Sequence, residues 1–242
     1  MPTRDENEDQ LAGTVGNSLR RWLARARDAV MAPFRRSRLM PDPDAMFSVQ
    51  EAWNVEVDTI LTHIGRISMD AWAEATDVPP VSRHAFVMAQ LAFTQNFLVR
   101  IPDEVYNLVF AEIVDGANAG ESVDQVAVRV DRILTYTGSE RWPARARTIA
   151  QTETTRAYGA GTLAAGLEQS RVTGRLLRKR WDSTRDNRVR AGHREVDGVT
   201  TQLGMPFYVD GFPLMFPGDP LGPPETVINC RCDLIIVNEE GR

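Results

Sequence analysis

Apolar side chains recur every three or four residues along most of the chain, which is the spacing of amphipathic helices. Near the N-terminus this pattern predicts a helix from about residue 17 to just before Pro33, formed on Leu19, Trp22, Leu23, Ala26 and Val30. Residues 1–16 are polar and charged and show no such period. Arginines occupy the other faces of this helix, so residues 1–41 are interpreted as a basic N-terminal arm. Such an arm could lie on nucleic acid, a membrane surface, a partner protein or its own domain.

Residues 42–173 are predicted to form a helical body. The capping boxes of Ser48 with Glu51 and of Ser122 with Gln125 each predict the start of a helix. Between them, one helix is expected from about Ser82, and another begins at Pro102, a residue suited to the first turn. The helix from Ser82 is expected to turn one side inward, carrying Phe86, Ala89, Phe93 and Phe97.

The longest helix is expected over about residues 144–169. Its inner stripe comprises Ala146, Ile149, Ala150, Ala157, Leu163 and Leu167. Two of the three histidines, His63 and His84, fall inside the predicted helices of the body and are interpreted as ordinary core or surface residues.

From Gly174 the pattern changes to short apolar runs separated by frequent glycine and proline. Residues 175–182 (RLLRKRWD) and 233–237 (DLIIV) have the composition and length of strands. The expected fold class is therefore α+β, with a mainly helical N-terminal body followed by a small C-terminal α+β module over residues 174–242.

Charge is strongly segregated within a net charge of −5. Residues 42–140 hold 5 basic and 16 acidic side chains, whereas residues 141–194 hold 13 basic and 4 acidic ones. The basic blocks, residues 1–41 and 141–194, are the parts that offer phosphate a favourable field. No stretch approaches the ~20 apolar residues that cross a bilayer, so no membrane-spanning helix is expected. The polar, charged N-terminus does not resemble a secretory signal.

Cys230 and Cys232 are separated by one residue, so on a strand both thiols would project from the same face. His193 would supply a third ligand, and Asp186 or Asp197 would complete a tetrahedral zinc site. Zinc is the one cofactor that this pattern indicates. The alternative is that the thiols pack as small apolar groups while His193 hydrogen-bonds a carbonyl or carboxylate. A disulfide between the two cysteines is disfavoured by its strained geometry.

Nine basic side chains fall within residues 171–194, a density that is unusual for a chain with an isoelectric point near 5.3. On a strand, Arg178 and Arg180 would share one face, opposite Lys179 and Trp181, and would form a stripe able to follow phosphates. The candidate DNA-binding set is Arg175, Arg178, Lys179, Arg180, Arg185, Arg188 and Arg190. The alternative is that these residues pair with acidic groups of the helical body or of a partner.

An enzyme centred on His193 is a rival interpretation, because Asp186, Glu195 and Asp197 could complete a metal-dependent hydrolase or nuclease cluster. The chain lacks the H-E-x-x-H motif, a phosphate-binding glycine loop and a nucleophile elbow. The simpler interpretation is a polar network that fixes loops, with Asp186 pairing Arg188 or Arg190.

The order of motifs in the C-terminal third resembles that of a known family. Trp181 precedes a turn at residues 184–186, followed by Val189-Arg190, His193, Asp197-Gly198, Pro206-Phe207, Phe216-Pro217-Gly218-Asp219-Pro220 and Asn229-Cys230-Arg231-Cys232. This sequence closely resembles the C-terminal domain of the phage Mu F-like minor head proteins, the phage head morphogenesis family. The stretch at residues 146–158 (ARTIAQTETTRAY) and Gly120-Glu121-Ser122 with the helix after it are similar too. The resemblance covers about residues 105–237. Within it, six residues are expected to hold the module's shape: Trp181, Asp186, Asp197, Phe216, Pro217 and Asn229.

The resemblance implies a virion component of a tailed bacteriophage, present in few copies in the capsid interior near the portal. It implies a role in head morphogenesis and in retaining or delivering packaged DNA. The implied partners are the portal protein, the major capsid or scaffold protein and double-stranded DNA, and no membrane contact is implied. During assembly the protein is expected in the host cytoplasm. Some members carry a toxin enzyme after the module, but only about five residues follow the last strand here, so no enzyme is expected. The alternatives are a hydrolase or nuclease centred on His193 and a non-specific DNA-binding virion protein.

Overall fold

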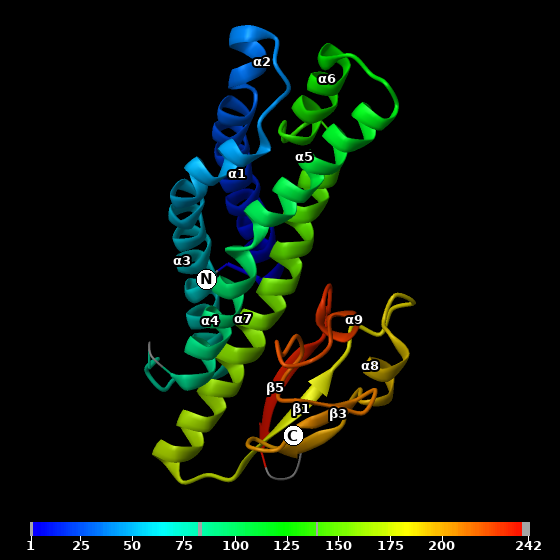
Figure 1. Cartoon of the computed structure of the whole chain (residues 1–242). Helices are drawn as coiled ribbons and strands as arrows, with labels where there is room; N and C mark the ends of the chain where they lie inside the picture. Colours follow the sequence, from blue (N-terminus) through cyan, green and yellow to red (C-terminus); the bar gives the residue numbers. More distant parts are fainter. Residues whose placement is uncertain (1, 82–83, 139, 239–242) are drawn as a thin grey trace. The chain divides into compact units, whose positions relative to one another are not determined.

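The computed structural model describes residues 2–81, 84–138 and 140–238. They divide into two compact units. Unit 1 draws on the chain up to Ala12, on Leu61–Thr94 and on the chain from Thr148 onward, and unit 2 comprises Gly13–Ile60 and Gln95–Arg147. This division differs from the three sequence segments, because four long helices each contribute residues to both units. Figure 1 labels the α-helices and the strands β1, β3 and β5.

The predicted α+β class is confirmed, since most of the described residues are helical and the strands gather near the C-terminus. The helices before the strands are α1 (Arg4–Val30), α2 (Ala32–Ser37), the 3-10 helix η1 (Pro43–Val49), α3 (Gln50–Ala75), α4 (Ala85–Leu98), α5 (Ile101–Asn118), α6 (Val123–Ile133) and α7 (Arg141–Thr173). No helix within the described ranges has a stretch long and apolar enough to span a membrane.

The N-terminal prediction is wrong in its starting point, because α1 begins at Arg4 and not near residue 17. Leu11 and Val15 extend the apolar stripe backwards by two turns, and both are fully buried. The capping box at Ser48 is also wrong. The Ser48 hydroxyl donates to the Ala45 carbonyl at 2.7 Å inside η1. The second box is confirmed, with Ser122 and Gln125 capping α6 reciprocally.

Helix α4 turns a different face inward from the one predicted. Its buried positions include Val87, Gln90, Thr94 and Leu98, whereas Phe93 is 40 % exposed. The spacing of the apolar residues predicted the wrong inward face because two of the buried side chains, Gln90 and Thr94, are polar and form hydrogen bonds to α7. The predicted start at Ser82 lies outside the described residues, and His84 precedes the helix. His63 lies within α3, as predicted.

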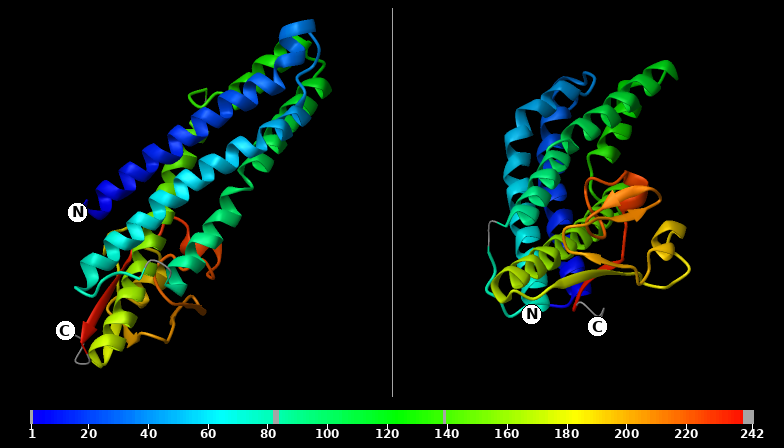
Figure 2. Two further views of the ribbon diagram at one scale, coloured as in Figure 1. Left: turned by 90° about the vertical axis from the view of Figure 1, so that its left-hand side faces the viewer. Right: turned by 90° about the horizontal axis from the view of Figure 1, so that it is seen from below.

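Unit 2 is a bundle of helical segments with tryptophans at its centre. Trp22, Trp53 and Trp142 are fully buried, and the first two lie with ring centroids 5.5 Å apart. Each indole N–H donates to a backbone carbonyl, at 2.6–3.1 Å. A buried indole is therefore hydrogen-bonded at each of these three positions, as such groups require. Figure 2 shows the parts of α1 and α3 in this unit side by side, where Arg21 pairs with Glu56.

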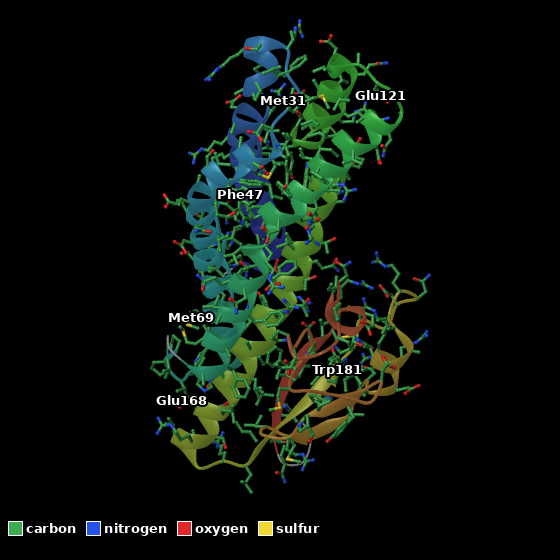
Figure 3. The ribbon with its side chains drawn as sticks, viewed as in Figure 1. Met31, Phe47, Met69, Glu121, Glu168 and Trp181 are labelled. Atoms are coloured by element: carbon green, nitrogen blue, oxygen red, sulfur yellow. The ribbon has the colours of Figure 1, made fainter. Side chains whose placement is uncertain are left out.

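Unit 1 contains the sheet, of order β2-β1-β5 with both pairs antiparallel. Its strands are β1 (Leu177–Asp182), β2 (Thr200–Gln202) and β5 (Asp233–Asn238), and a separate hairpin pairs β3 (Phe207–Val209) with β4 (Phe212–Leu214). The short helices α8 (Ala191–Glu195) and α9 (Pro224–Val227) lie in the connections. One core joins these strands to α7, through Ala160 and Leu163 of the helix and Trp181 of β1. Figure 3 labels Trp181 on β1.

Candidate functional site

A buried cluster of one histidine and two cysteines lies in the C-terminal part of unit 1. The Nδ1 atom of His193 is 3.3 Å from Sγ of Cys232 and 3.6 Å from Sγ of Cys230. The three side chains are 1–3 % exposed, and both thiols are free. The structure thus brings together the three residues predicted as metal ligands. The cysteines lie in the irregular segment just before β5 and not on the strand itself.

His193 is positioned by α8 and by the packing of its ring. Arg190, at the start of this helix, donates to the carbonyls of Thr226 at 3.3 Å and Ile228 at 2.6 Å, which ties α8 to the segment leading to the cysteines. The imidazole meets Trp181 edge to face, with ring centroids 5.5 Å apart. Its Nε2 atom is buried without a hydrogen-bond partner among the described residues. The ring therefore directs only Nδ1 towards the thiols.

The cysteine segment is held by side chains of α7 and α1. The Thr152 hydroxyl oxygen accepts from the Asn229 N–H at 3.1 Å, and the Thr155 hydroxyl donates to the Cys230 carbonyl at 2.5 Å. Arg4 donates to Thr155 at 2.7 Å and to the Cys232 carbonyl at 3.4 Å, and it also pairs with the carboxylate of Asp233. Sequence reasoning missed Arg4, Thr152 and Thr155 as parts of this site. These interactions hold the backbone between the two thiols.

The two thiols are electrostatically unequal. A hydrogen bond from Cys232 holds the pKa of Cys230 below its ordinary value, against the opposing effect of burial. The same hydrogen bond and burial raise the pKa of Cys232 well above its ordinary value. The two thiols therefore titrate as one coupled pair.

The two aspartates considered as a fourth ligand are occupied elsewhere. Both carboxylate oxygens of Asp186 accept from Arg231, at 2.7 and 2.8 Å, and this hydrogen bonding holds the pKa of Asp186 well below its usual range. Asp197 accepts from the Ser183 N–H and from Arg185, both at 2.9 Å. Neither belongs to the cluster with His193. The polar-network interpretation fits both residues, although the main partner of Asp186 is Arg231 and not Arg188 or Arg190.

A buried ion pair lies in the middle of α7. Arg156 donates to Glu153 at 2.6 Å, and their side chains are 6 % and 2 % exposed. Glu153 also accepts from Thr94 of α4 at 2.5 Å, and Arg156 also donates to the Gly218 carbonyl at 3.0 Å. Sequence reasoning missed this pair. The signal was present, because Glu153 stands four residues from both Ile149 and Ala157 and so falls on the apolar stripe.

The turn that contains Phe216 and Pro217 packs on the same helix. A Cβ atom on Gly159 would approach Phe216 to 2.6 Å and the Pro217 carbonyl to 3.0 Å, so glycine allows the close approach. Phe216 is 3 % exposed, and Asn229 adopts a positive φ of 55° just before the first cysteine. The residues predicted to hold the module's shape therefore occupy turns and core positions.

The basic stretch is only partly available to a ligand. Lys179 is fully buried, its ammonium donates to the Met215 carbonyl at 2.7 Å, and burial lowers its pKa to about 8. Its predicted contact with phosphate is therefore wrong. Arg178 and Arg180 alternate with the buried Lys179 and Trp181, as predicted. Among the other candidates, Arg175, Arg185 and Arg188 are exposed. Arg190 is half-buried, and its guanidinium donates to backbone carbonyls.

Half-buried aspartates contact two of these arginines. Arg185 pairs with Asp182 at 2.8 Å and with Asp197 at 2.9 Å, while its side chain remains 66 % exposed. Arg188 lies 3.6 Å from Asp186 with its side chain 74 % exposed. These acidic partners belong to the C-terminal module itself and not to the helical body.

Comparison with known proteins gives a consistent result. The sequence model of the family described as Phage Mu protein F like protein matches residues 107–235. The minor head protein GP7 of Bacillus phage SPP1 is 31 % identical over 139 residues, which are 55 % of this chain and 41 % of that protein. The NAD(+)–arginine ADP-ribosyltransferase EFV of Enterococcus faecalis is 28 % identical over 144 residues, 58 % of this chain and 27 % of that enzyme. The chain thus spans less than half the length of these curated relatives. No solved structure matches.

Proposed function

The chain belongs to the Phage Mu protein F like family, and on that basis we propose that it is a minor head protein of a tailed bacteriophage. In this role it is a structural component of the virion that acts in head morphogenesis and not an enzyme. The observation that carries the proposal is the family match, which covers more than half of the chain and includes the whole segment from α7 to the start of β5. The similarity to a minor head protein of another phage supports it.

The non-enzymatic role is supported by the state of the residues that an enzyme would need. His193 is 2 % exposed, and the carboxylates of Asp186 and Asp197 are engaged by arginines. A hydrolase or nuclease needs such groups to face a substrate. The similarity to an ADP-ribosyltransferase covers only 27 % of that enzyme, so it gives little support for transferring its activity to this chain.

The proposed place of the protein is the capsid interior near the portal, with the portal protein as its main partner and the scaffold or major capsid protein as further candidates. Unit 2 exposes a row of aromatic rings that supports a role in protein binding. Tyr106 lies between Phe47 and Phe110, with ring centroids 5.4 and 6.2 Å away, and the two phenylalanines are 62 % and 50 % exposed. Exposed apolar side chains gathered in this way are typical of interaction surfaces. Phe47 is labelled in Figure 3.

We further propose that the protein contacts packaged double-stranded DNA without sequence preference. The support is the set of exposed arginines of the C-terminal module, above all Arg185 and Arg188. Their side chains are 66 % and 74 % exposed beside half-buried aspartates, and ion pairs at a protein surface are worth only about 0–1 kcal/mol each. Phosphate oxygens can therefore replace the carboxylates at little cost, with release of counterions from the DNA.

Replacing the exposed Arg175, Arg185 and Arg188 together with glutamine tests this proposal. We expect weaker binding to random duplex DNA and a flatter dependence on salt, by about 0.9 in the logarithmic slope for each phosphate that the variant no longer neutralises. Stability should change little, because substitutions of exposed side chains usually shift it by less than about 0.5 kcal/mol. Binding at several salt concentrations, denaturant unfolding and capture by purified portal protein are the three measurements.

The same variant separates the rival interpretations. If DNA affinity is unchanged while stability or portal binding falls, the arginines bind other groups of the protein or the portal, and the DNA proposal is wrong. A variant unchanged in all three measurements would show that these arginines are only solvated surface residues and bind neither DNA nor the portal.

A further inference from the structure

We propose that His193, Cys230 and Cys232 bind one zinc ion, with a water molecule as the fourth ligand. Thiolate sulfur and imidazole nitrogen are the ligands that zinc prefers in proteins, and three protein ligands with one water complete a tetrahedron, as they do in catalytic zinc sites. The inference rests on these side chains alone and is independent of the role of the protein in the virion.

The distances fit such an ion. With a Zn–S length of about 2.3 Å and a Zn–N length of about 2.0–2.1 Å, tetrahedral angles place the imidazole nitrogen about 3.5–3.6 Å from each sulfur. Nδ1 of His193 lies 3.3 Å from Sγ of Cys232 and 3.6 Å from Sγ of Cys230. The three ligand atoms lie within 4.8 Å of one another. The two nitrogen–sulfur distances are therefore within a few tenths of an ångström of those in a tetrahedral site.

The surroundings hold the ligands in place. The backbone on either side of the thiols is fixed by Thr152, Thr155 and Arg4, and the imidazole is packed against Trp181. Ligands whose orientation is set by neighbouring groups bind metal more tightly than mobile ones.

A water molecule is the expected fourth ligand. Among the described residues, no further histidine, cysteine, aspartate or glutamate joins the cluster. A cavity of about 20 Å³ adjoins it, lined in part by Thr184, Asn229 and Arg231. That volume holds about one water molecule and no larger ligand. The ion would therefore act as a cross-link and not as a centre for hydrolysis.

The cross-link would join distant parts of the module. His193 and Cys230 are 37 residues apart, and β2, β3, β4 and α9 all lie between them. Because residues this far apart form the site only in the folded chain, the free energy of metal binding should add to the stability of the module.

The test is the metal content of the purified full chain. Protein produced with zinc in the medium should carry about one equivalent of zinc. The variants His193→Gln, Cys230→Ser and Cys232→Ser should lose it. The matched control is His63→Gln, which changes a histidine of the same compact unit outside the cluster and should keep the zinc. Chelation of wild-type protein should lower its melting temperature, since removing a ligand of the folded state destabilises that state.

Cobalt(II) gives a second measurement that does not depend on whether the variants fold. Metal-free wild-type protein should bind one cobalt ion, with the thiolate charge-transfer and intense ligand-field absorption of a tetrahedral site. Wild-type protein that is folded, has both thiols reactive to alkylation after unfolding, and binds neither zinc nor cobalt would overturn the proposal. The cluster would then be a packed histidine with two thiols. Zinc retained in a double variant, Cys230→Ser with Cys232→Ser, would equally show that the ion lies elsewhere.

Discussion

Replacing Arg156 with alanine is expected to lower the free energy of unfolding by about 3–5 kcal/mol. The reason is that the carboxylate of Glu153, 2 % exposed, would lose its cation and keep only neutral donors such as Thr94. An uncompensated buried charge is far more costly than a broken surface pair. Denaturant unfolding of the purified protein measures the difference.

The same helix supplies a matched control. Arg171 pairs with Glu168 three residues away, as Arg156 does with Glu153, but the Arg171 side chain is 70 % exposed. Arg171→Ala should therefore cost less than about 1 kcal/mol. Equal losses for the two variants would contradict the burial argument. A double variant, Glu153→Gln with Arg156→Met, should recover much of the loss, because no buried charge remains.

Replacing Gly161 with alanine is expected to destabilise the protein by about 1–3 kcal/mol. A Cβ atom there would lie 2.2 Å from the carbonyl oxygen of Ser68 on α3, a backbone atom that cannot rotate away. The two helices would have to separate locally within unit 1. This loss should exceed the gain of about 0.5–1 kcal/mol that alanine brings to a helix interior.

Gly13, inside α1, is the control for this substitution. Nothing lies within 4 Å of its added Cβ atom, so Gly13→Ala should stabilise the protein by about 0.5–1 kcal/mol. The two variants make the same chemical change and should have opposite signs, as thermal or denaturant unfolding can show. A stabilised Gly161→Ala variant would mean that α3 and α7 do not approach each other so closely.

Features that depend on neighbouring residues could be predicted from the sequence. The capping box of Ser122 and Gln125 is confirmed because both partners lie within one helical turn. The alternation of Arg178 and Arg180 with Lys179 and Trp181 is confirmed because it follows from the pleat of one strand. The same alternation placed Lys179 on the face of Trp181, which the core encloses, and it was counted as a ligand for phosphate only because of its charge.

Features that depend on distant partners were missed. Gln90 and Thr94 face inward on α4 because Glu153, about sixty residues later, needs hydrogen-bond donors. Asp186 is paired by Arg231, 45 residues away, whereas the sequence favoured arginines close by. The trio of His193, Cys230 and Cys232 was found because its members carry recognisable chemistry. Arg4, Thr152 and Thr155, which hold the cysteine segment, carry no such signal without the fold.

Quantitative mass spectrometry of purified particles is the most direct test of the central claim, that the protein is a minor component of the phage head. In mature virions of the phage that encodes the chain, we expect its peptides at a small fraction of the amount of the major capsid protein. Its absence from both mature virions and procapsids would contradict the claim.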